Sequence, residues 1–190
     1  MTAGFVREAR ASDAPGLARI QVSSWRSSLA GLVPSEILEE LGGAEEQFTE
    51  RWRDAITNPP TGKHRVHVAV SPDTGPGGDP GAGTAGLPPV GFASAGPATD
   101  EDKWPGTDAE LYELHVLPSD SEAGHGERLL HAIADTLAED GFRTACTWAL
   151  AGDSARLAFL EAAGWAPDGS RSNLDMGIKV PVVRLHTQIS

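Results

Sequence analysis

One amphipathic stretch, residues 124–140, constrains the fold of this chain more than any other part of its sequence. Its large apolar side chains recur four residues apart along one face: Leu129, Ile133 and Leu137. This spacing is typical of a helix with one apolar side, and Gly141 follows at the position where a helix commonly ends. Apolar strand patterns flank the stretch at 110–117 and 144–150. Because the helix must bury its apolar side, we expect it to cover a sheet built from such strands.

The same patterns along the whole chain predict strands and helices in a mixed order. Strands are expected at 5–9, 65–70, 90–95, 110–117 and 144–150, and after Trp165 and Leu174. Helices are expected from a cap at Ser12 or Asp13 to about Ser24, from Pro34 to Ile56 with a break at Gly42-Gly43, over 124–140, and from a cap at Asp153 to before Gly164. This order predicts one α/β domain (mixed α+β) over residues 1–190, with a twisted, mostly antiparallel central sheet of about seven strands flanked by helices.

Length and charge narrow the class of function. A chain of 190 residues fits one domain with a substantial core. Lys and Arg number 15 against 27 Asp and Glu, and the resulting charge of −12 disfavours binding to nucleic acid or anionic membranes. The single cysteine, the absence of an apolar run of about 18 residues and the lack of a secretory signal pattern favour a cytoplasmic protein.

One stretch of the chain is rich in glycine and proline. Residues 72–89 contain 11 Gly or Pro among 18 positions. Such a composition cannot hold a helix or bury enough apolar surface to order itself. We therefore expect a flexible loop at about 71–89 between two strands of a hairpin. A phosphate-binding loop is disfavoured there because the stretch contains no Lys or Arg.

Two ionisable side chains interrupt the apolar strand expected at 110–117. Strict alternation places Tyr112, Leu114 and Val116 on one face, and Leu111, Glu113, His115 and Leu117 on the other. A carboxylate and an imidazole in an apolar wall are costly unless they pair with each other or line a wet cleft. Glu113 and His115 are therefore candidates for a catalytic base, with a structural pair or a solvated sheet face as the alternatives.

Glycines mark the entry to the helix expected at 124–140. Gly124 and Gly126 permit close backbone approach and leave the first-turn N–H groups at the positive end of the helix. This arrangement favours an anion, although two glycines can also merely shape a tight turn. The loop lacks the Lys-Ser/Thr pair of a P-loop, and Leu129 stands where a dinucleotide fingerprint has its third glycine.

Together these segments resemble the GNAT superfamily of acyl-CoA-dependent N-acyltransferases. The resemblance rests on strand 111–116 with Pro118, on the loop Ser121-x-x-Gly124-x-Gly126, and on segment 153–165. A weaker similarity at 21–34 matches the substrate-side opening of many bacterial members. It covers nearly the whole chain outside the Gly/Pro-rich loop and implies a single GNAT-like domain.

The resemblance implies acetyl-CoA as the cosubstrate. In that family the diphosphate of coenzyme A lies on backbone N–H groups of the glycine loop and the pantetheine arm runs along the preceding strand, so cationic side chains are hardly needed. Asp153 stands where the family usually has an Asn that contacts the cofactor. The implied cofactor-binding residues are Leu114, His115, Val116, Ser121, Glu122, Ala123, Gly124, His125, Gly126 and Asp153.

The reaction implied is direct transfer of an acetyl group to an amine while both substrates are bound. An alkylammonium with a pKa near 10 must first lose a proton, and Glu113 is the preferred acceptor, with His115 in reserve. A backbone N–H near Val116 would stabilise charge on the thioester oxygen. Trp25 and Glu113 are candidates for contact with the acceptor, which is expected to be a small-molecule amine or an exposed amino group.

Two positions depart from the family pattern. Ser121 replaces the usual Gln or Arg at the start of the loop, and Leu160 replaces the Tyr that commonly protonates the departing thiolate. Ser154 or an ordered water is the expected substitute, and a thiol pKa of about 8.5 means that loss of the acid slows the reaction without forbidding it. The alternative is an acyl-CoA-binding GNAT-like module with little or no turnover.

The remaining candidates are weaker. No metal is expected, because His64 and His67 fall on opposite faces of a strand. Cys146 lies in the middle of a strand, where a buried inert thiol is the natural interpretation. The expected partner is an amine substrate, without nucleic acid or membrane, and a homodimer is left open.

Overall fold

The computed structural model describes residues 4–71, 87–100 and 107–189. The Gly/Pro-rich loop expected at about 71–89 falls mostly on residues 72–86, outside the described residues, and Pro89 already begins a strand. Among the described helices, none is long and apolar enough to cross a membrane.

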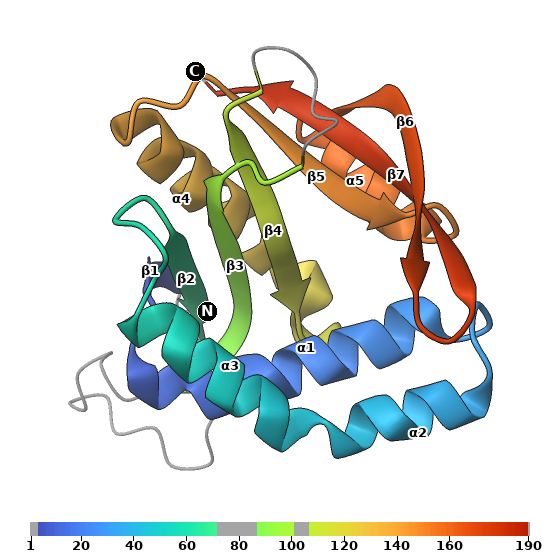
Figure 1. The fold of residues 1–190 in the computed structure, drawn as a ribbon. Helices are drawn as coiled ribbons and strands as arrows, with labels where there is room; N and C mark the ends of the chain where they lie inside the picture. Colours follow the sequence, from blue (N-terminus) through green and yellow to red (C-terminus); the bar gives the residue numbers. More distant parts are fainter. Residues whose placement is uncertain (1–3, 72–86, 101–106, 190) are drawn as a thin grey trace.

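Seven strands form one sheet in the described part of the chain (Figure 1). They are β1 (Phe5–Glu8), β2 (Arg65–Val70), β3 (Pro89–Pro97), β4 (Ala109–Val116), β5 (Thr144–Leu150), β6 (Ala166–Asp175) and β7 (Lys179–Gln188). Their spatial order is β1-β2-β3-β4-β5-β7-β6. Every neighbouring pair is antiparallel except β4 and β5. The predicted mixed α/β class with a mostly antiparallel sheet is confirmed.

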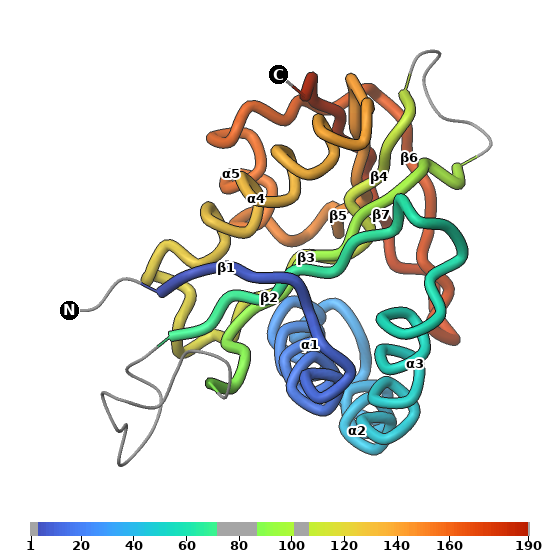
Figure 2. Tube along the Cα trace, turned by 90° about the vertical axis from the view of Figure 1, so that its left-hand side faces the viewer, coloured from blue at the N-terminus to red at the C-terminus, as the bar shows by residue number. Residues whose placement is uncertain are grey.

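Helices cover both faces of this sheet (Figure 2). On one face lie α1 (Ala14–Leu29), α2 (Ser35–Gly43) and α3 (Glu45–Thr57), and on the other lie α4 (His125–Glu139) and α5 (Ser154–Ala162). Each face has its own core. The core beneath α1 and α3 includes Leu17, Trp52 and Phe92. The core beneath α4 holds the predicted stripe of Leu129, Ile133 and Leu137.

The first helix differs from the sequence expectation at both ends. The Asp13 carboxylate does not cap α1. It accepts hydrogen bonds from the Arg7 guanidinium at 2.7 and 2.9 Å and from Arg10 N at 2.7 Å. The helix also continues beyond Ser24 to Leu29, because the buried Leu29 anchors its last turn in a small apolar cluster. Tertiary contacts thus override the local capping signal.

A β-bulge in β4 breaks the alternation that the sequence suggests. The register between β3 and β4 shifts between Ser94 and Ala95, which leaves Tyr112 as the extra residue on β4. As a result Leu111 and Leu114 lie in the same core beneath α4. The predicted placement of Leu111 on the face of the ionisable pair is therefore wrong.

The parallel strands β4 and β5 pair over two residues and then diverge. Ala109 is opposite Ala145, and Glu110 is opposite Cys146. Beyond this point β5 stays paired with β7 along its whole length, while β4 stays paired with β3. Because each strand keeps its outer partner, the sheet opens between them without losing its other ladders.

Leu129 is expected to be a main anchor of α4 on the sheet. Its side chain is fully buried and lies close to Gly91, whose missing Cβ allows the approach. Leu129→Ala should lower the free energy of unfolding by about 2–5 kcal/mol, measured by urea denaturation. Glu139→Ala, an exposed position on the same helix, is the control and should change it by less than about 0.5 kcal/mol. Equal effects of the two variants would contradict this packing.

Candidate active site

A cleft of about 1020 Å³ opens where β4 and β5 diverge. Its lining comes from both faces of the sheet. Ser24 and Trp25 of α1 line it from one face, and Gly124 and Arg156 line it from the other. Two ligands that enter from opposite faces can therefore meet in the opening.

Glu113 projects from β4 toward α1 and is held by a buried amide. Its Oε1 accepts a hydrogen bond of 3.1 Å from Gln21 Nε2, and Gln21 Oε1 accepts one of 2.9 Å from Trp52 Nε1. Gln21 and Trp52 are both buried. The indole thus fixes the orientation of the amide, and the amide fixes the carboxylate at the cleft.

His115 lies behind Glu113 with both ring nitrogens occupied. Its Nε2 contacts the second carboxylate oxygen of Glu113, and its Nδ1 lies 2.9 Å from Ser24 Oγ. The side chain of Glu113 is 26% exposed, against 8% for His115. Glu113 is therefore the member of the pair that an incoming substrate can reach, and His115 is placed to support it.

The glycine loop forms the entry to α4. A 3-10 turn, η3 (Pro118–Ala123), leads to Gly124, whose φ of 70° is left-handed. Since no side chain caps α4, its first-turn N–H groups can receive an acceptor from the cleft. Ser121, Glu122, Gly124 and Gly126 all line the cleft.

Two of the ten implied cofactor contacts lie elsewhere. Ala123 is absent from the lining of the cleft, and its carbonyl accepts a hydrogen bond from Arg128 Nη2 at 2.7 Å. His125 is buried and also lies outside the lining. Burial, and next the charge of Arg128, lower the pKa of His125, so its ring adds no positive charge to the loop at neutral pH.

Of the candidate residues in segment 153–165, only Asp153 lines the cleft. Asp153 lines the cleft, and its Oδ1 caps α5 by accepting a hydrogen bond of 3.0 Å from Arg156 N. Ser154 is exposed and does not belong to the lining. Leu160 is fully buried in the core beneath α4. Neither Ser154 nor Leu160 therefore faces the opening.

Sequence reasoning missed Arg156. Its Nη1 donates a hydrogen bond of 2.6 Å to Leu114 O, a carbonyl in the part of β4 that has lost β5 as a partner. Thr147 Oγ1 caps Leu111 O in the same way at 2.8 Å. One signal was available, since position 156 lies one helical turn after the cap at Asp153 and shares its face.

Sequence reasoning also missed Gln21 and Ser24, which support Glu113 and His115. They are three residues apart on α1 and therefore share one helix face. Their partners are 92 and 91 residues further along the chain, so no local pattern indicates the contacts.

Aromatic and acidic side chains also line the cleft. Trp25, Tyr112 and Trp148 belong to this lining, as do Asp100 and Glu110. The ring of Trp25 packs edge-on against Phe48 of α3 at 5.8 Å between centroids. Trp25 is thus a wall of the opening, as expected from its position in the sequence.

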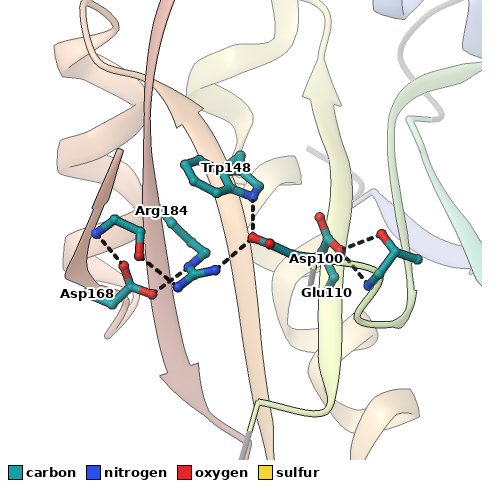
Figure 3. A network of polar contacts seen from close by, with 7 residues as sticks. Asp100, Glu110, Trp148, Asp168 and Arg184 are labelled. Carbon is teal, nitrogen blue, oxygen red and sulfur yellow. Dashed lines mark hydrogen bonds and ion pairs between the residues drawn. The ribbon is translucent and has the colours of Figure 1, made fainter. Parts of the chain in front are cut away.

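A buried arginine holds Trp148 in place (Figure 3). Arg184 is 2% exposed and pairs with Asp100 at 2.7 Å and with Asp168 at 2.6 Å. Its guanidinium lies 5.5 Å from the centre of the Trp148 ring, and Trp148 Nε1 donates to Asp100 Oδ2 at 3.2 Å. The indole therefore presents a fixed face to the cleft.

The same network changes the pKa of Asp168. Burial acts to raise the pKa of Asp168, but hydrogen bonds from Ser170 and Arg184 and the positive charge of Arg184 outweigh it. The pKa of Asp168 is consequently below its ordinary value of 3.8. A carboxylate with a lowered pKa stabilises the fold above its unfolded-state pKa, and this stabilisation is lost as the pH falls through the folded-state pKa.

Comparisons with known proteins find similarity to N-acetyltransferases. No protein-family model matches the sequence. The uncharacterized N-acetyltransferase YuaI of Bacillus subtilis strain 168 is 29% identical over 145 residues, which cover 76% of this chain and 70% of that protein.

Two solved structures superpose on nearly the whole chain. The PaiA N-acetyltransferase of Thermoplasma acidophilum in complex with coenzyme A has a TM-score of 0.67 at 15% identity, covering 98% of this chain and 99% of that one. A GCN5-related N-acetyltransferase from Rhodopseudomonas palustris has a TM-score of 0.69 at 17% identity, covering 99% and 97%. At such identities the two structures establish the shared fold.

Asp168→Asn tests the buried network. At neutral pH the variant should be less stable to urea by about 3 kcal/mol, because one partner of a buried ion pair is removed. The difference from the natural protein should begin to shrink as the pH falls below about 4, where the unfolded chain takes up the proton, and should vanish below the lowered pKa of Asp168 in the folded protein. Asp135→Asn, at an exposed position, is the control and should show no such trend. A difference that stays constant with pH would contradict the assignment.

Proposed function

We propose that the chain is a member of the GNAT superfamily and that it transfers an acetyl group from acetyl-CoA to an amine by direct attack in a ternary complex. The acceptor is a small-molecule amine or an exposed amino group. One observation carries the proposal: the cleft joins an uncapped helix N-terminus on one face of the sheet to an accessible carboxylate on the other.

The α4 side of the cleft fits the coenzyme. The amides of the loop from Ser121 to Gly126 would hold the diphosphate, because phosphate oxygens accept hydrogen bonds from N–H groups at a helix N-terminus. Gly126 adds no side chain in this path. The pantetheine arm would lie along Leu114–Val116, where β4 faces the opening instead of β5. Glu122 is exposed and can stay in solvent while the backbone binds the anion.

The α1 side fits a protonated amine. Glu113 would accept the proton of the ammonium group directly or through water, which frees the lone pair for attack on the thioester. Gln21 and His115 hold the carboxylate in place for this step, and Ser24 holds His115. A backbone N–H near Val116 would stabilise charge on the thioester oxygen. Aromatic walls such as Trp25 and Trp148 suit a cationic acceptor.

Location and partners are part of the same proposal. The charge of −12 and the single cysteine support a cytoplasmic enzyme that needs no metal and binds neither nucleic acid nor membrane. A homodimer is compatible with this activity.

The second candidate function is an acyl-CoA-binding module with little turnover. It is favoured by the buried position of Leu160 and by the exposure of Ser154 outside the cleft. Calorimetric titration with acetyl-CoA, followed by a thiol-release assay over a panel of amines, separates the two functions. Binding together with amine-dependent thiol release supports the enzyme, whereas binding without release from any amine supports the module.

Two glycines with similar backbone geometry test the loop. Gly124 and Gly141 both have a left-handed φ, of 70° and 88°, but only Gly124 lines the cleft. An added methyl group at Gly124 meets the end of the Arg128 side chain at 3.2 Å, and the left-handed φ is strained for any residue with a Cβ, so we expect the backbone of the loop to shift. Gly124→Ala should weaken coenzyme A binding at least about tenfold in calorimetry, equivalent to about 1.4 kcal/mol.

The control variant is Gly141→Ala, which carries a similar backbone strain of about 1–3 kcal/mol. It should lower the melting temperature to a similar extent and leave the affinity for coenzyme A unchanged. If both variants bind coenzyme A as the natural protein does, the loop does not hold the diphosphate.

Glu113→Gln tests the proposed base through the pH dependence of turnover. At pH 7 it should lower kcat about 100-fold or more, because the amide cannot take the proton of the ammonium group. The deficit should shrink as the pH approaches about 10, where the free amine exists without help. Glu161→Gln, at an exposed position of α5, should match the natural enzyme at every pH. A deficit independent of pH would rule out Glu113 as the base.

A further inference from the structure

Within the described residues, the positions expected to supply a proton to the leaving group of the proposed reaction do not reach the opening. Leu160 is buried beneath α4, and Ser154 lies outside the cleft. Tyr112 is the single tyrosine of the chain, and its hydroxyl already donates to Pro97 O at 2.5 Å. Burial raises the pKa of Cys146 to about 12, and this thiol is enclosed in the sheet. None of these four side chains is placed to stabilise the thiolate as it departs.

Arg156 occupies the place where such a group is needed. Its guanidinium reaches from α5 to β4 and donates to Leu114 O at 2.6 Å. Asp153 caps the helix through the Arg156 amide, so the backbone from which the side chain extends is fixed. The guanidinium therefore stands beside the stretch of β4 along which the pantetheine arm is proposed to run.

Among the described residues, no ion pair neutralises the charge of Arg156. It is the only lysine or arginine among the described residues that line the cleft. Six carboxylate residues share this lining: Asp100, Glu110, Glu113, Glu122, Glu127 and Asp153. Within the described part of the chain, none of them forms an ion pair with Arg156. One of its five N–H donors is bound to a neutral carbonyl, and the others can turn to an anion.

The partly dehydrated surroundings of Arg156 strengthen the attraction between its charge and a nearby anion. Burial lowers the pKa of Arg156, while the more distant charges of Glu113 and Asp153 oppose the shift. Arginine nevertheless stays protonated in proteins. A fixed positive charge in a partly dehydrated site stabilises developing negative charge more strongly than it would in water.

We propose that Arg156 is a catalytic residue that stabilises the coenzyme A thiolate while the thioester breaks. Glu113 first takes one proton from the ammonium group. The freed amine nitrogen then forms a bond to the acetyl carbon, the electron pair of the C–S bond passes to sulfur, and the nitrogen releases its second proton to water to give the neutral amide. Arg156 keeps its own protons and donates hydrogen bonds to the sulfur. Water later protonates the thiolate. This inference rests on the proposed acetyltransferase function and replaces the acid that position 160 does not supply.

A different role for Arg156 makes the opposite prediction. If the guanidinium only plugs the opening by holding Leu114 O, the pantetheine arm must displace it. Removal of the plug would then tighten coenzyme A binding and leave kcat unchanged or raised. The two roles therefore separate in a comparison of binding with turnover.

The test combines Arg156→Met with a second acetyl donor. Arg156→Met should lower kcat with acetyl-CoA about 100-fold to 1000-fold, the range for loss of one donor to a developing anion. Its affinity for coenzyme A in calorimetry should stay within about threefold. With the selenoester analogue of acetyl-CoA, whose selenolate needs less stabilisation, the deficit should fall at least about tenfold. Arg156→Lys, which keeps a charge and a donor, should retain most of the activity and covers the case in which the methionine variant does not fold.

Arg143→Met, at an exposed position, is the control and should match the natural enzyme with both donors. Tighter coenzyme A binding with unchanged kcat in Arg156→Met would overturn the proposal, as would the same deficit with the thioester and the selenoester. These failures leave the acetyltransferase function standing, because the natural enzyme is active in both. If none of the amines tested causes the natural protein to release thiol, both the proposed function and the role of Arg156 are wrong.

Discussion

The short parallel ladder between β4 and β5 is the constraint on which the rest of the site depends. Each strand keeps a full antiparallel partner, β3 or β7, so the sheet can open between them at the cost of a few backbone hydrogen bonds. Buried carbonyls still require donors. Thr147 and Arg156 supply them to Leu111 and Leu114, so two side chains replace the missing strand partner. The opening is thereby stable and also carries a charge at its centre.

Charge is distributed unevenly around this opening. Backbone amides at the start of α4 supply positive character where an anion is proposed to bind. Among the lining residues that the structure describes, six carboxylates accompany one guanidinium. The carboxylate of Glu113 is oriented by buried partners from α1 and α3, whereas Arg184 is neutralised by Asp100 and Asp168. An acceptor amine would thus meet carboxylates and aromatic rings, and the coenzyme would meet amides and Arg156.

Elements encoded by nearby residues were predicted well. The stripe of α4, the cap of α5 by Asp153 and the period-two pattern of β2 depend on residues within about one turn or one strand of each other. Asp13 was misjudged, since Arg7 and Arg10 take the carboxylate that was expected to cap α1. The bulge at Tyr112 was also missed, because register depends on the partner strand.

The sequence by itself determined the order of strands and helices, the glycines at the start of α4 and the presence of an acid on β4. Each of these features depends only on residues that are close together along the chain. Only the tertiary structure decided that Gln21 and Ser24 hold Glu113 and His115, at sequence separations of 92 and 91. It also decided that Arg156 crosses to β4, 42 residues earlier in the chain. Such contacts depend on where the sheet opens between β4 and β5, and that opening depends on strand pairings between residues far apart in the sequence.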